Sequence, residues 1–121
     1  MDCRGVRGAI TAKENTPQAI ITASQTLLRG LVEANGISFQ DVASIIFTTT
    51  PDLDAAFPAE AARQMGWYEV ALLCTREMPV EEDLPRCIRV LIHWNTEKEA
   101  HEIVHLYLGE AQKLRPDRAA G

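Results

Sequence analysis

An arginine lies in a segment whose other residues follow the apolar alternation of a β-strand. In residues 87–94, CIRVLIHW, every second side chain from Ile88 to Trp94 is apolar, at the period of two that a pleated strand imposes. Arg89 falls on the opposite face, whose other members are also mostly apolar. A guanidinium on a covered face requires a carboxylate or phosphate partner, because an unpaired buried charge is very costly. Glu77 is a possible partner, so the residues alone leave two interpretations open: a structural ion pair at a subunit interface, or a site for an anionic ligand.

The string HEIVH satisfies the H-E-x-x-H pattern of zinc hydrolases. On a helix, His101 and His105 would share a face one turn apart and could hold zinc, with Glu102 as the general base. The extended form of the motif requires a glycine and a third histidine at the positions that here hold Leu108 and Ala111. The metallohydrolase therefore stays an alternative, and we expect an exposed helical turn whose histidines face solvent.

Composition excludes several classes of protein. The 121 residues fit one compact domain, and a net charge of -5 without a basic run makes nucleic acid an unsuitable partner. The sequence contains no apolar run of roughly 20 residues that could cross a bilayer, and its first residues lack the apolar core of a secretory signal. Three cysteines without a C-x-x-C pair indicate reduced, buried thiols. We therefore expect a cytoplasmic protein that does not bind a membrane.

The apolar periodicity predicts a small α/β sheet with helices packed on it. The clearest helix can be capped by Thr16, has Pro17 at its first position and ends at Gly36. The end of the chain is ambiguous, because residues 96–114 carry a helical stripe while IVHLYL alone could be a buried strand; periodicity favours the helix. The expected strands are residues 2–11, 41–50, 68–75 and 85–94, and the expected helices are residues 16–35 and 58–66.

Four groups of motifs follow one another between residues 3 and 118: RGVRGAIT, TTTPDLDAAFPAEAAR, CTREM with RCIRVLIHW, and YL with LRPD. Together they closely resemble the small trimeric α/β class of monofunctional chorismate mutase. The resemblance implies the rearrangement of chorismate to prephenate, a step of aromatic amino-acid biosynthesis that needs no cofactor or metal. It also implies a mixed five-stranded sheet with two main helices, and a homotrimer with a barrel-like core and active sites at the subunit interfaces. At the chain's end it implies a short helix followed by a strand, against the single helix that periodicity favours.

The resemblance also assigns roles to individual residues. Arg89 matches the arginine that faces the ether oxygen, and Glu77 the carboxylate that takes the ring hydroxyl and balances positive charge on the allylic fragment. Arg7 matches an arginine that binds a substrate carboxylate, with Tyr107 beside it. The remaining substrate-binding matches are Cys74 as a wall residue, Phe57, Ala59 and Arg63 from the neighbouring subunit, and Leu114 and Arg115 from a C-terminal covering segment.

We expect one domain, residues 1–116, followed by a mobile tail at 117–121. Many relatives have lysine where this sequence has Glu60, a change that would weaken the attraction for a dianion at the pocket entrance. A non-catalytic trimer that binds a metabolite on the same fold therefore remains a second interpretation.

Overall fold

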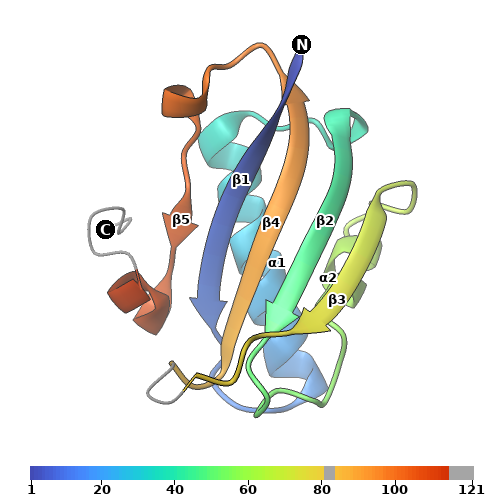
Figure 1. The fold of residues 1–121 in the computed structure, drawn as a ribbon. Helices are drawn as coiled ribbons and strands as arrows, with labels where there is room; N and C mark the ends of the chain where they lie inside the picture. Colours follow the sequence, from blue (N-terminus) through green and yellow to red (C-terminus); the bar gives the residue numbers. More distant parts are fainter. Residues whose placement is uncertain (81–83, 115–121) are drawn as a thin grey trace.

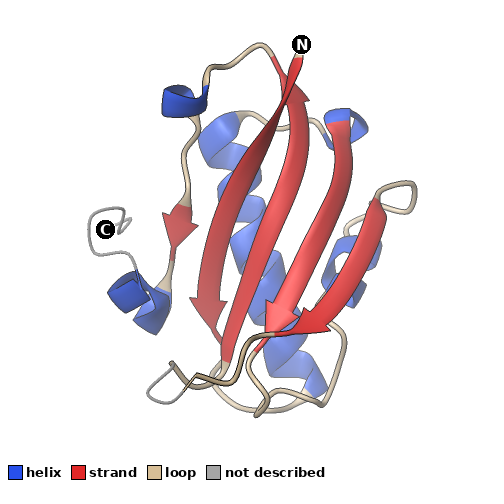
Figure 2. Cartoon of the chain, in the orientation of Figure 1, coloured by secondary structure: helices blue, strands red, loops and turns tan. Residues whose placement is uncertain are grey.

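A five-stranded mixed sheet forms one layer of the molecule, and two α-helices cover one of its faces (Figures 1 and 2). The computed structural model describes residues 1–80 and 84–114. The strand order is β3-β2-β4-β1-β5, and β4 pairs antiparallel with both of its neighbours. The bounds are β1 Asp2–Thr11, α1 Pro17–Asn35, β2 Val42–Thr49, α2 Ala59–Gln64, β3 Ala71–Arg76, β4 Cys87–Thr96 and β5 Leu106–Tyr107. The mixed five-stranded sheet with two main helices, expected from the resemblance, is confirmed.

Local sequence signals set both ends of α1. The Oγ1 atom of Thr16 accepts a hydrogen bond from the Ala19 N–H at 3.2 Å, and Pro17 occupies the first helical turn. At the other end Gly36 takes the left-handed conformation, with φ 71°, and its N–H donates to the Val32 carbonyl. The buried face of the helix packs its apolar side chains against the sheet. The helix is therefore where capping and periodicity predict it.

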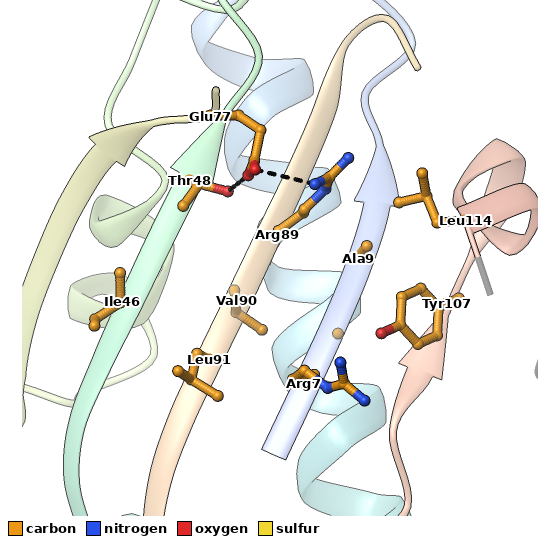
Figure 3. A pocket seen from close by; sticks show the side chains of 11 residues that line it. Arg7, Ala9, Ile46, Thr48, Glu77, Arg89, Val90, Leu91, Tyr107 and Leu114 are labelled. Atoms are coloured by element: carbon orange, nitrogen blue, oxygen red, sulfur yellow. Dashed lines mark hydrogen bonds and ion pairs between the residues drawn. The ribbon is translucent and has the colours of Figure 1, made fainter. Parts of the chain in front are cut away.

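The alternation predicted for β4 is confirmed. Ile88, Val90, Ile92 and Trp94 are buried in the core between the sheet and α1. The other face of β4 is open: both α-helices lie behind the sheet, and Arg89 points to the side without them (Figures 1 and 3). None of the described helices is long and apolar enough to cross a membrane.

The single C-terminal helix that periodicity favoured is wrong. A 3-10 turn at Ala100–Glu102 leads to the short strand β5, which pairs parallel with β1, and a second 3-10 segment covers Gly109–Leu114. The outer edge of β1 offers unpaired backbone groups, and pairing with them satisfies residues 106–108 while it buries Tyr107. Long-range pairing thus overrides a local helical stripe. The predictions for Arg115 and for residues 117–121 lie outside the described residues.

Candidate active site

A pocket of about 460 Å³ opens on the face of the sheet that lacks helices (Figure 3). Arginine, glutamate, tyrosine and threonine side chains contribute its polar groups, and aliphatic side chains form most of the rest of its wall. The volume lies in the range of small-molecule sites. The lining residues are Arg7, Gly8, Ala9, Ile46, Thr48, Glu77, Arg89, Val90, Leu91, Tyr107 and Leu114.

Arg89 and Glu77 form an ion pair at one side of this pocket. The Nη1 atom of Arg89 lies 3.1 Å from Oε1 of Glu77, and their side chains are 30% and 21% exposed. The other oxygen of Glu77, Oε2, accepts a hydrogen bond from the Thr48 hydroxyl at 2.5 Å. The Glu77 N–H donates to the Thr49 carbonyl at 2.9 Å, which fixes the backbone just after β3. The Arg89 guanidinium and the Thr48 hydroxyl each contact one oxygen of the Glu77 carboxylate, and together they fix its orientation.

The register of the sheet explains why Arg89 reaches the pocket. Its direct neighbours are Ala9 on β1 and Thr48 on β2. Adjacent strands place paired side chains on the same face, so a small side chain flanks the guanidinium on each side. This arrangement leaves space above the sheet for a ligand.

Arg7, Tyr107 and Leu114 form the opposite side of the pocket. Arg7 is exposed on β1, whereas Tyr107 is only 6% exposed because β5 packs it along the edge of that strand. Figure 3 shows Arg7 and Tyr107 close to each other, with Arg89 across the strand and Leu114 from the last 3-10 segment at the rim. The structure thus brings together five residues predicted from the sequence, drawn from β1, β4, the end of β3 and the C-terminal segment.

Four other predicted residues gather elsewhere in the same chain. Cys74 pairs in register with Phe47, a core residue, so its side chain lies on the helix-covered face of β3. Cys74 and Phe57 line a separate pocket, and Phe57 is 70% exposed. Ala59 begins α2, and Arg63 lies in its last turn. Both residues act on Cys74: burial raises the pKa of its thiol, against smaller lowering by a hydrogen bond from the Ala59 backbone and by the positive charge of Arg63. A single chain therefore holds two separate groups of site residues.

Glu60 occupies one side of the Arg63 guanidinium. Its Oε2 atom lies 3.0 Å from Nη1 of Arg63, one helical turn away, and both side chains are nearly half exposed. The negative charge of Glu60 therefore partly offsets the positive charge of Arg63, which the family resemblance places in the site.

The HEIVH string does not have the geometry that its metal-binding counterpart requires. His101 and Glu102 lie in one 3-10 turn, whereas residues 103–105 leave the helix before His105 is reached. The Glu102 carboxylate accepts a hydrogen bond from the Glu99 N–H, and Nδ1 of His105 accepts one from the Arg7 N–H. The two histidines therefore do not share the helical face on which the metallohydrolase interpretation depends.

Thr48 was not predicted from the sequence, although it orients Glu77. The signal that could have found it is parity: in SIIFTT, the buried residues Ile45, Phe47 and Thr49 leave Ile46 and Thr48 on the open face. Reading this face together with that of Arg89 requires the strand register, which a single sequence does not give.

Comparisons with known proteins agree with this geometry. The family described as chorismate mutase type I matches residues 3–118. The chain is 56% identical over 115 residues to chorismate mutase AroH of Thermus thermophilus, with 94% of each chain covered. It is 39% identical over 118 residues to chorismate mutase AroH of Bacillus subtilis, with 97% of this chain and 93% of that protein covered. A solved chorismate mutase from Clostridium thermocellum gives a TM-score of 0.89 at 49% identity and covers 90% of this chain and 97% of that one. The chain therefore belongs to the chorismate mutase type I family of isomerases.

Proposed function

We propose that this protein converts chorismate to prephenate in the pocket between Arg89 and Arg7, without covalent catalysis or a metal. The observation that carries the proposal is the placement of two arginines, one carboxylate and one phenol around a single pocket of small-molecule size. A substrate with two carboxylates fits such a pocket because guanidinium groups bind carboxylates through fixed pairs of N–H donors.

The chemistry is a rearrangement within one molecule. The ether C–O bond breaks while a new C–C bond forms, so electron density moves to the ether oxygen and the allylic fragment gains partial positive charge. Arg89 donates to that oxygen, and Glu77, which Thr48 and the Thr49 carbonyl hold in place, lies against the positive fragment. Donors already oriented toward developing charge need no reorganisation during the reaction. No atom enters or leaves, so the protein needs only to hold the reactive conformer and stabilise this charge separation.

Arg7 and Tyr107 bind a substrate carboxylate at the other side of the pocket. Both residues are carried by β1 and β5, whose pairing sets their spacing. Leu114, at the end of the described chain, covers this side with an apolar side chain. In this arrangement Arg89 acts mainly on the reacting oxygen, and Arg7 acts mainly on binding.

The complete site includes residues of a neighbouring subunit in a homotrimer. Phe57, Ala59, Arg63 and Cys74 do not line the pocket of their own chain, and they form a second group beside β3. Large apolar side chains in and after this edge strand are exposed, which is typical of a contact surface: Leu73 at 59%, Met78 at 72% and Val80 at 59%. A cyclic arrangement in which the β3 side of one copy meets the open sheet face of the next would join the two groups.

Complementation between two inactive variants tests this shared site. Arg7→Ala damages the pocket group, and Arg63→Ala damages the second group. If each site uses both groups from different subunits, random mixed trimers contain intact sites at about a quarter of their interfaces, the product of one half and one half. Co-expression should therefore restore up to that fraction of wild-type turnover. Activity no higher than the mean of the two separate variants would show that each site lies within one chain.

Glu60 lowers the affinity for a dianion in this proposal, because its carboxylate pairs with Arg63. The core residues are unchanged, so turnover is retained. Binding of chorismate or prephenate without conversion would instead support the non-catalytic metabolite-binding trimer. The cytoplasmic location expected from the sequence stays a prediction.

A further inference from the structure

His105, the last residue of the HEIVH string, contacts the strand that carries Arg7. Its Nδ1 atom accepts a hydrogen bond from the Arg7 backbone N–H at 2.9 Å. The ladder between β1 and β5 is very short, with Gly8 paired to Leu106 and Ala9 paired to Tyr107. The imidazole therefore adds one more bond to β1 just before the strand pairing begins.

Val104, the residue before His105, is held by hydrogen bonds to α1. The Asn35 side chain, which belongs to a residue only 3% exposed at the end of α1, accepts from the Val104 N–H at 2.8 Å and donates to the Val104 carbonyl at 2.9 Å. The same amide donates to the Leu31 carbonyl at 3.0 Å. The chain thus enters β5 between two side-chain contacts, one to α1 and one to β1.

We propose that His105 is a positioning residue, which fixes the Arg7 backbone relative to β5 and so sets the spacing between Arg7 and Tyr107. The inference rests on the proposed function, in which these two residues bind one substrate carboxylate. The Arg7 N–H donates to Nδ1, so the imidazole is neutral there and carries its proton on Nε2. A side chain at position 105 supports the substrate end of the pocket only if it presents an acceptor at the place of Nδ1.

Two substitutions separate this acceptor from the rest of the imidazole. His105→Asn places its Oδ1 atom at the same number of bonds from the backbone as Nδ1, and can keep the hydrogen bond. His105→Phe keeps a ring of similar shape and loses the acceptor. His101→Phe is the matched control, because His101 belongs to the same string and is exposed. We expect the KM for chorismate to rise about tenfold in the phenylalanine variant with kcat changed much less, and to stay within about twofold of wild type in the asparagine variant and in the control.

A second pair keeps the inference testable if the phenylalanine variant folds poorly. His105→Gln carries the same amide one bond further out, where it no longer matches Nδ1. The inference predicts a higher KM for the glutamine variant than for the asparagine variant, at equal melting temperatures. Equal KM values for these two variants, or a wild-type KM for a folded phenylalanine variant, would overturn it.

The outcome is distinguishable from failure of the proposed function by Arg7→Ala measured in parallel. If Arg7→Ala raises KM while the phenylalanine and glutamine variants at position 105 do not, only the role of His105 is wrong. If the wild-type protein converts no chorismate, or Arg7→Ala leaves KM unchanged, the proposed site itself is wrong, and the inference falls with it.

Discussion

Replacing Arg89 with lysine tests the part of the site that acts on the breaking bond. The guanidinium lies between Ala9 and Thr48, with one nitrogen 3.1 Å from Glu77. Its planar fork can hold this carboxylate through one nitrogen and present another N–H toward the pocket. A lysine ammonium has a shorter reach and no fixed fork, so it keeps the charge but cannot make both contacts in set directions.

The expected loss follows from the role of the donor. Removing one oriented donor to a developing oxyanion costs about 3 kcal/mol, and each 1.36 kcal/mol is a factor of ten in rate, so kcat should fall roughly 100-fold. The assay is the initial rate of chorismate loss, followed by ultraviolet absorbance over a range of substrate concentrations. Arg29→Lys, on the exposed side of α1, is the matched control and should retain wild-type kcat. A folded Arg89→Lys variant with kcat within about threefold of wild type would refute the assignment of Arg89 to the ether oxygen.

Three further predictions concern other groups in the chain. Thr48→Val keeps the side-chain shape but removes the hydrogen bond to Glu77. Because a hydrogen bond to a charged group is lost, kcat/KM should fall by about tenfold or more. Thr48→Ser keeps the hydroxyl, so an equal loss of kcat/KM in that variant would contradict the role of the hydrogen bond. Gly8→Ala would place a Cβ atom 2.9 Å from Leu27 Cδ1, so urea unfolding should show a stability loss of about 1–3 kcal/mol, and an unchanged midpoint would contradict the close packing. Burial raises the pKa of the Cys74 thiol. The rate of its alkylation by iodoacetamide, measured by peptide mass spectrometry, should therefore increase with pH around a midpoint above that of an ordinary cysteine. A midpoint at or below the ordinary value would contradict the raised pKa.

Much of the fold follows from local patterns in the sequence. The capping threonine and the glycine stop define α1, and the apolar alternation defines β4, because both signals act within a few residues. The alternation alone also assigns Arg89 to the face of β4 that points away from the core, where Figure 3 shows it. The part of the site that depends on one strand's parity is therefore predictable.

The C-terminal segment was not predictable in this way. Its apolar residues satisfy a helical period. However, hydrogen bonds with Asn35 and pairing with the edge of β1, both distant in the sequence, hold it as an extended strand. The position of Tyr107 in the pocket depends on this long-range capture. Periodicity reads only local order, so the correct expectation came from the family resemblance alone.

The single chain groups the site residues differently from the family resemblance. Cys74 and Glu77 are three residues apart, and an odd separation along an extended chain places two side chains on opposite faces of the sheet. The family resemblance places both residues in one site, whereas the single chain separates them. Joining the two groups needs a second subunit, which the proposed trimer provides.

The most direct test of the central claim is the loss of chorismate with purified protein in excess EDTA, with prephenate identified as the product. We predict rapid conversion at a rate that the chelator does not change, because Arg89, Glu77, Arg7 and Tyr107 supply the polar groups that the proposed rearrangement uses. Conversion no faster than the uncatalysed reaction, or activity that EDTA abolishes and added zinc restores, would contradict it.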